Sequence, residues 1–156
     1  MSPASSPARV VADADVLAAD LLVGGTARES LSHIRRHSWV ELVASDALLS
    51  DAQKLIRTLA DASLATDWRA LIETERVPVS HPENDHPALA SAYRGDAAHL
   101  LSFDPTLTTA AANLSVQPYT ALSVRTPDAF VTVFDAKRLY ESLYDEPYPG
   151  PDREGR

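Results

Sequence analysis

Acidic residues stand where apolar runs end in this chain, and their spacing points to chemistry with divalent cations. Asp13 directly follows the apolar residues 10–12, Asp15 comes two positions later, and Asp104 closes the apolar stretch 98–103. Clustered carboxylates in a chain without cysteine favour hard cations such as Mg²⁺ or Mn²⁺, which prefer oxygen ligands. The chemistry most often built this way is phosphodiester hydrolysis.

Each acid also has a purely structural interpretation. Asp104 can cap a helix that begins at Pro105, and Asp85 can help to cap one that begins at Pro87. Asp13 has no obvious local cap to make, and burying an unpaired carboxylate is costly, which favours a functional role. It could instead start an Asx-type turn.

Apolar runs alternate with helical patterns along the chain, which predicts an α/β fold. We expect strands at residues 9–13, 40–45, 77–80, 98–103 and 121–125, and helices at 16–36 (with a break at Gly24–Gly25), 45–61, 63–75, 85–93, 104–114 and 126–144. This alternation predicts a three-layer α/β/α sandwich with a central parallel sheet. Because ligands lie beyond the carboxyl ends of such strands, Asp13 and Asp104 can converge on one crevice.

Length and composition favour a single domain. The chain has 156 residues, of which 45% are hydrophobic, and no stretch is apolar enough to span a bilayer or to form a signal peptide. We therefore expect a cytoplasmic protein that does not bind membranes. Residues 9–144 form the predicted domain, and the segments 1–8 and 145–156, rich in Pro, Ser, Gly and charge, are expected to be disordered tails.

The charge balance is acidic. Asp and Glu number 22 against 14 Lys and Arg, giving a net charge of -8, and only Lys54 and Lys137 are lysines. This balance argues against a general electrostatic grip on nucleic acid. An acidic, lysine-poor surface also suits concentrated salt, so we expect a salt-adapted organism.

Helix phase ranks two acids of the helix expected over residues 45–61. Its apolar stripe is expected to centre near Ala52 and Leu59, which places Asp46 on the opposite face and Asp51 on the flank, within reach of a crevice. Asp51 is therefore the better candidate for a site.

The histidines and the basic patch are weaker signals. His33 and His37 lie one helical turn apart and are expected at the surface. Between them, Arg35 and Arg36 form the densest basic patch, which is either a solvated face or a contact for RNA phosphates.

The order of several segments resembles the PIN domain, especially its toxin-like branch in toxin–antitoxin systems. These segments are "DADVL", "ELVASDALLSD", "HPENDHPALASAY", "HLLSFD" and "RTPDAF", and the likeness covers residues 9–143. The resemblance implies a parallel-sheet sandwich and a ribonuclease that depends on Mg²⁺ or Mn²⁺. It also implies an RNA substrate, an antitoxin partner and a homodimer as candidate partners.

The resemblance assigns roles to individual acids. The first acid of the family falls on Asp13, with Asp15 in place of the usual Asn or Ser. The second falls on Asp51, where the family usually has Glu. The fourth falls on Asp104, with Ser102 in place of Thr.

The third acid is where this chain departs from the family pattern. The usual gap before Asp104 ends on His86, and Asp85 is its neighbour. Either the loop shifts by one residue and Asp85 serves, or histidine has replaced the acid. A histidine would weaken Mg²⁺ binding and favour Mn²⁺, or would mark an inactive member.

Three functions follow as hypotheses. The leading one is a metal-dependent endoribonuclease that uses Asp13, Asp51, Asp104 and Asp85, with Asp15, Ser102 and His86 in support. The second is a degenerate PIN-like module that binds RNA or a protein without cutting. The third is a phosphate-handling α/β enzyme of receiver-like or phosphatase type, for which no suitable Lys or Thr partner is found.

Overall fold

A single all-parallel sheet forms the middle of the molecule. The computed structural model describes residues 6–108 and 122–154, and within them five strands pair side by side in the order β3-β2-β1-β4-β5. The strands are β1 (Ser6–Ala12), β2 (Glu41–Ser45), β3 (Arg76–Val79), β4 (Ala97–Leu101) and β5 (Ser123–Arg125). The predicted α/β fold with a parallel sheet is confirmed.

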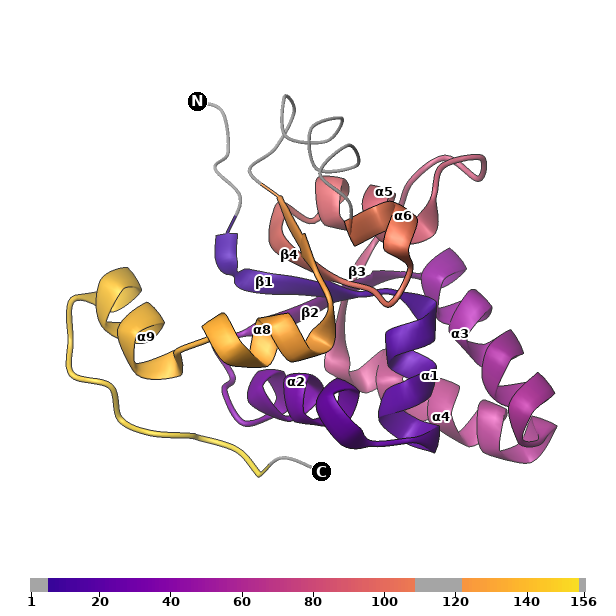
Figure 1. Ribbon diagram of the computed structural model, residues 1–156, viewed down its shortest axis with the longest axis horizontal. Coiled ribbons are helices and arrows are strands. Elements are labelled where there is room, and N and C mark those ends of the chain that lie inside the picture. Colours follow the sequence, from indigo (N-terminus) through magenta and orange to yellow (C-terminus); the bar gives the residue numbers. More distant parts are fainter. Residues whose placement is uncertain (1–5, 109–121, 155–156) are drawn as a thin grey trace.

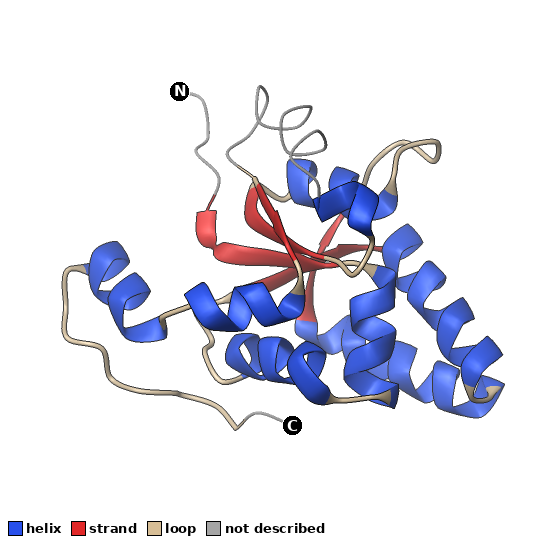
Figure 2. Ribbon diagram, viewed as in Figure 1, coloured by secondary structure: helices blue, strands red, loops and turns tan. Residues whose placement is uncertain are grey.

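Helices cover both faces of this sheet, as Figures 1 and 2 show. They are α1 (Ala14–Leu22), α2 (Gly25–Arg35), α3 (Asp46–Leu59), α4 (Ala62–Glu75), α5 (Pro87–Arg94), α6 (Pro105–Thr108), α8 (Pro127–Val133) and α9 (Ala136–Tyr144). In Figure 1, α5 and α6 lie above the sheet, and α1 to α4 and α8 lie below it. The result is the expected three-layer α/β/α sandwich. Among the described helices, none has the length and apolar character needed to cross a membrane.

Local sequence signals set the helix boundaries. The Ser45 hydroxyl accepts a hydrogen bond from the backbone N–H of Leu48 and caps α3, and Asp61 caps α4 through the N–H of Leu64. α5 begins with Pro87. A backbone N–H at the first position of a helix has no intrahelical acceptor, so a proline there, which lacks the N–H, loses no hydrogen bond. Gly24, with a φ of 89°, ends the preceding helix and turns the chain into α2, which confirms the predicted break.

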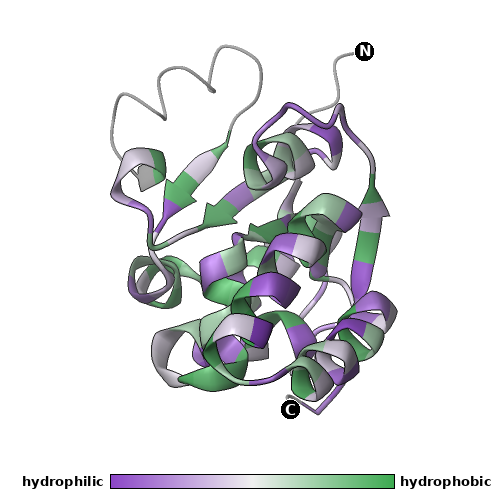
Figure 3. Cartoon of the chain, turned by 90° about the vertical axis from the view of Figure 1, so that its right-hand side faces the viewer, coloured by the Kyte–Doolittle hydropathy of each residue, from purple (hydrophilic) through white to green (hydrophobic). Residues whose placement is uncertain are grey.

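The core lies between the sheet and its two helical layers. Its largest fully buried side chains include Phe130 of α8, Leu17 of α1, Leu31 of α2, Leu49 of α3 and Leu100 of β4. In Figure 3 the strands are mostly green, whereas the helices alternate between green and purple, as helices with one apolar face do. Burial of these side chains is the main favourable term in the folding of the sandwich.

The two predicted tails differ from the structure. β1 begins at Ser6, inside the predicted N-terminal tail 1–8, and the Ser6 N–H donates to the carbonyl of Asp96 over 2.7 Å. At the other end, the described part of the predicted tail 145–156 makes side-chain and backbone hydrogen bonds to residues 36–38, which directly follow α2. Proline is abundant in both segments, but composition alone does not predict which hydrogen-bond partners a segment will find.

Two predicted helices also differ. The helix expected over residues 126–144 is split into α8 and α9, because the Asp135 carboxylate accepts from the N–H of Arg138 and starts a new helix. The helix expected over 104–114 is described only as α6, and the rest of it lies outside the described residues.

A buried ion-pair cluster joins α1, α2 and α4. Arg35 donates from Nη1 and Nη2 to the two carboxylate oxygens of Asp20, over 3.0 and 2.6 Å, and its Nε lies 3.4 Å from Glu75. The side chains of Arg35 and Asp20 are only 7% and 5% exposed. A bidentate pair this deeply buried depends on both partners, since either charge alone is left uncompensated in an apolar surrounding.

Replacing Asp20 with alanine should therefore destabilise the fold strongly. We expect Asp20→Ala to lower the free energy of unfolding by about 3–5 kcal/mol, because the Arg35 guanidinium keeps only the longer contact to Glu75. Urea denaturation measures this loss. The matched control is Arg36→Ala at the exposed neighbouring position, which should change stability by less than about 0.5 kcal/mol. Equal losses in the two variants would contradict the assignment.

Candidate functional site

The strand order predicts a ligand crevice at the carboxyl edge of the sheet, between β1 and β4. From β1 the chain moves to β2 and then β3 on one side, and α5 then carries it back across β1 to β4 on the other side. In open α/β sheets, ligands bind where the order reverses, beyond the carboxyl ends of the two strands concerned. Here those strands are β1 and β4, and they end next to Asp13 and Asp104.

Asp13 stands directly after β1 and is held on both carboxylate oxygens. Oδ1 accepts from the N–H of Ala14 over 2.8 Å and so caps α1, and Oδ2 accepts from the hydroxyl of Ser102 over 2.8 Å. The expectation that no local cap explains Asp13 is therefore wrong. Each carboxylate oxygen has two lone pairs, so one remains on each oxygen beyond these two bonds.

Ser102 links the two strand-end acids. Its fully buried hydroxyl donates to Asp13 and accepts from the backbone N–H of Asp104 over 3.0 Å. Asp104 in turn accepts from the N–H and hydroxyl of Thr106, over 2.9 and 2.8 Å, which lowers the pKa of its carboxyl. The predicted cap at the start of α6 is thus confirmed, and the same residue belongs to the crevice.

Asp15 lies between these two acids. Its Oδ2 accepts from the N–H of Phe103 over 3.1 Å, while its Oδ1 is buried and has no hydrogen-bond partner in the described structure. Burial raises the pKa of this carboxyl, and the negative charges of Asp13 and Asp104 raise it further. The structure therefore brings Asp15 within electrostatic range of both Asp13 and Asp104, the two acids for which the strand-end argument predicted convergence.

The loop 80–86 lies at the same edge and carries two histidines. His81 has Nδ1 2.9 Å from the carbonyl of Pro82, so Nδ1 carries the proton and Nε2 accepts from the Ser45 hydroxyl over 2.8 Å. His86 occupies the N-cap position of α5, and its charge contributes to the lowered pKa of Asp104.

Asp85 does not make the cap that its structural interpretation predicted. It is exposed, and the cap position of α5 belongs to His86. Its backbone N–H donates to the carbonyl of Pro82, and its role as a metal ligand stays a prediction.

Asp51 is exposed on α3, and the phase argument that favoured it is wrong in its premise. The buried stripe of α3 consists of Leu48, Leu49, Ala52 and Ile56, whereas Leu59, one of its expected centres, is 69% exposed. With the stripe displaced, Asp51 lies no nearer to it than Asp46 does. Asp46 is an exposed surface residue, as expected, and pairs with Arg76 over 2.7 Å.

The basic patch does not serve this edge. The Arg35 side chain is buried and paired with Asp20 and Glu75. This burial contradicts both interpretations proposed for it, a solvated face and a contact for RNA phosphates. Arg36 is exposed, but it closes α2 directly before β2 and so lies at the amino end of the strands, opposite the acids. His37 is 2% exposed rather than at the surface.

The side chains at this edge are of the kind that binds a divalent cation, but they are not placed as the ligands of a formed metal site. Within residues 6–108 and 122–154, no three His, Asp or Glu side chains are grouped closely enough to hold a metal ion. The donors are nonetheless oxygens, and one of them, Oδ1 of Asp15, is buried without a hydrogen-bond partner among the described residues. Such a donor set fits Mg²⁺ or Mn²⁺ better than a soft metal.

Comparisons with known proteins show one relationship. The chain belongs to the family of unknown function DUF7384, whose model matches residues 4–156. No curated protein and no solved structure matches it. The resemblance to the PIN domain therefore stays a prediction.

The buried, partly unpartnered carboxyl of Asp15 predicts that its replacement by asparagine stabilises the fold. A carboxyl with a raised pKa in the folded state lowers stability once the pH exceeds its ordinary pKa of 3.8, because the folded protein resists ionisation. Asp15→Asn should therefore raise the thermal midpoint at pH 7, and the gain should shrink as the pH falls toward 3.8. Differential scanning calorimetry at several pH values measures this. Asp51→Asn, at an exposed position, is the control and should leave the midpoint unchanged.

Proposed function

We propose that this protein is a divalent-metal-dependent endoribonuclease whose active centre is the carboxyl edge between β1 and β4. The observation that carries the proposal is the tie between the two strand ends, Asp13 to Ser102 to Asp104, at the point where the strand order reverses. The PIN resemblance assigned the first and fourth acids to these same two residues.

The side chains have distinct roles in this proposal. Asp13 and Asp104 bind the cation, and Ser102 fixes the orientation of the Asp13 carboxylate through its Oδ2. Asp15 orients a water molecule or a ligand through its unpartnered Oδ1. A bound Mg²⁺ or Mn²⁺ supplies Lewis acidity and lowers the pKa of water for in-line attack on the phosphodiester.

Asp51, Asp85 and His86 complete the proposed set with different support. Asp51 and Asp85 are exposed, and the PIN resemblance alone assigns them. His86 has the support of its electrostatic coupling to Asp104. If His86 stands in the third position, its nitrogen donor favours Mn²⁺ over Mg²⁺.

A second function has an observation in its favour. The histidine at the start of α5, the exposed Asp51 and Asp85, and the lack of a ready metal-binding group among the described residues suit a module that binds RNA or protein without cutting. Cleavage and metal binding distinguish this module from the nuclease.

Cleavage of single-stranded RNA in Mn²⁺ at high salt is the direct test. We expect the wild-type protein to cut, Asp13→Asn and Asp104→Asn to lose cutting, and Ser102→Ala to lose roughly 10–100-fold in metal affinity or activity, as supporting residues of metal sites do. Calorimetric titration with Mn²⁺ reports binding independently of activity, and circular dichroism verifies the fold of each variant.

The control for this test is Arg36→Gln, which lies at the opposite end of the strands and should leave cutting unchanged. His86→Asp compared with Asp85→Asn shows which of the two neighbours serves: improved Mg²⁺ binding in the first variant selects His86. Intact RNA together with no Mn²⁺ binding to the wild-type protein rejects the nuclease in favour of the binding module.

A further inference from the structure

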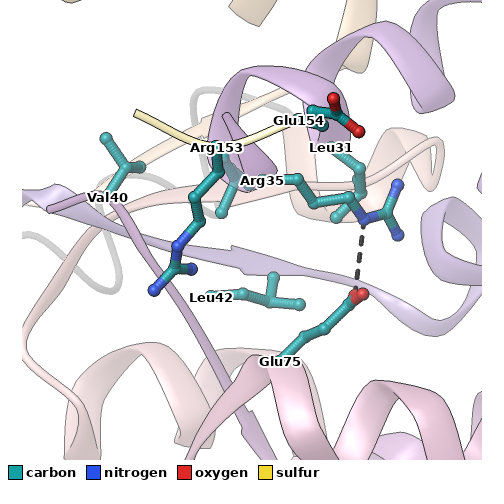
Figure 4. Close-up of a pocket in the computed structure, with 8 residues that line it drawn as sticks. Leu31, Arg35, Val40, Leu42, Glu75, Arg153 and Glu154 are labelled. Carbon is teal, nitrogen blue, oxygen red and sulfur yellow. Dashed lines mark hydrogen bonds and ion pairs between the residues drawn. The ribbon is translucent and has the colours of Figure 1, made fainter. Parts of the chain in front are cut away.

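Two pockets near the amino ends of the strands lie away from the proposed nuclease centre and differ in charge. The first opens between α2, β2 and α4, and Figure 4 shows Arg153 and Glu154 among its lining side chains. Because these two charges are opposite, the first pocket favours neither an anion nor a cation. The second is a groove of about 450 Å³ beside the start of β1, and its charges do make a choice.

The groove lies where the amino ends of three strands approach α9. Arg9 belongs to β1, Glu41 is the first residue of β2, and Asp96 directly precedes β4. Trp39, shortly before β2, and Tyr144, the last residue of α9, also line it. In Figure 1, α9 lies on the side of the molecule on which β1 begins. The acids of the nuclease centre stand at the other end of the same strands.

The charged side chains of the groove leave one carboxylate in excess. Arg9 donates from Nε to Glu41 over 3.0 Å and from Nη1 to the carbonyl of Gly95 over 2.9 Å. The Asp96 carboxylate makes no hydrogen bond or ion pair with any residue that the structure describes. Because one arginine faces two acids, the groove is negatively charged, which favours a cation.

The backbone holds Asp96 in a fixed place at the groove. Its φ of 53° is in the left-handed region, which aspartate and asparagine adopt more readily than other residues with a side chain. Its carbonyl accepts from the N–H of Ser6 over 2.7 Å, which ties it to the first residue of β1. Asparagine can therefore replace Asp96 and remove the charge without disturbing the chain.

Two aromatic rings form another wall of the groove. The rings of Trp39 and Tyr144 meet at 85°, with their centroids 6.3 Å apart. Tyr140 packs against both rings and holds the corner that they make. Aromatic rings attract cations through their electron-rich faces, tryptophan most strongly, and cages of such rings bind quaternary ammonium groups. The rings and the excess carboxylate thus favour the same kind of ligand.

We propose that this groove binds a quaternary ammonium compound. The positive charge faces the Asp96 carboxylate, and the methyl groups contact the rings of Trp39 and Tyr144. A quaternary nitrogen has no N–H to donate and needs no further acceptor. This suits the groove, since the backbone carbonyls of residues 95–96 already accept hydrogen bonds. The site is separate from the proposed nuclease centre and does not depend on it.

Choline is the probe for this site, titrated into the full chain while KCl keeps the ionic strength constant. The chain has two tryptophans, whose indole N–H groups report separately in NMR. We expect a saturable shift of the Trp39 signal at millimolar choline and none of the Trp68 signal, because Trp68 is buried in α4. Dimethylbutanol, in which carbon replaces the charged nitrogen of choline, should bind at least about ten-fold more weakly.

Substitutions in the groove separate the charge from the rings. Asp96→Asn should lower the choline affinity about five-fold, as loss of a solvent-accessible charge pair does. Asp67→Asn is the matched control, since it removes an exposed carboxylate of α4, outside the groove, and should leave the affinity unchanged. Tyr144→Leu keeps an apolar side chain but loses the ring, and should lower the affinity about three-fold. Circular dichroism verifies the fold of each variant.

Several results would overturn the proposal. One is a Trp39 signal that shows no saturable shift, and another is dimethylbutanol binding as tightly as choline. A third is equal affinity of the Asp96→Asn and Asp67→Asn variants. Ethanolamine, a primary amine, tests the preference for a quaternary nitrogen: weaker binding than choline supports it, and tighter binding overturns it.

Discussion

The reversal of strand order between β1 and β4 is the constraint on which the rest of the molecule depends. Because both strands are parallel and central, their carboxyl ends open side by side, and the loops that follow them must meet above the same crevice. Ser102 satisfies this geometry with one hydroxyl, which joins the start of α1 to the start of α6 through Asp13 and Asp104. Each acid therefore has two roles: Asp13 caps α1 and Asp104 caps α6, and both are linked through Ser102 at the edge of the sheet.

The same junction concentrates negative charge at a cost to the fold. Asp13 and Asp104 are each compensated by hydrogen bonds, whereas Asp15 has one carboxylate oxygen buried without a partner and a raised pKa. Purely structural demands would remove such a group, since an asparagine would accept the Phe103 N–H equally well. A stability cost retained in a crevice is typical of a functional site, because the group is held ready for a ligand that the folded chain alone does not supply.

Sequence reasoning succeeded where short-range physics decides. The strand ends, the Gly24 break and the Ser45 cap follow from period, turn chemistry and capping, all within a few residues. It failed where tertiary packing decides. The apolar residue types predict a stripe on α3 that includes Leu59, but this last residue of the helix is 69% exposed, so the buried stripe ends before it. The burial of Arg35 could be predicted from the sequence, because it stands one turn after Leu31 on the buried face of α2. Its partner Asp20 likewise stands one turn after the buried Val16 on α1. The sequence could not decide which residue takes the third position, because Asp85 and His86 are adjacent and a shift of the loop by one residue exchanges them.

The placement of the arginines bears on how such an acidic protein could bind RNA. Arg76, which reaches the end of β2, is neutralised by Asp46, and Arg35 is buried in its cluster, so neither offers charge to a phosphate. A phosphate that approaches Asp13, Asp15 and Asp104 is repelled by all three unless a cation lies between them. High salt weakens that repulsion only beyond a few ångströms, so it does not replace the cation at contact distance. In the proposed nuclease, the acidic edge would therefore make a divalent ion a condition of substrate binding as well as of chemistry. In this respect the proposed nuclease differs from proteins that hold RNA by a basic groove, and its substrate affinity depends on the metal first.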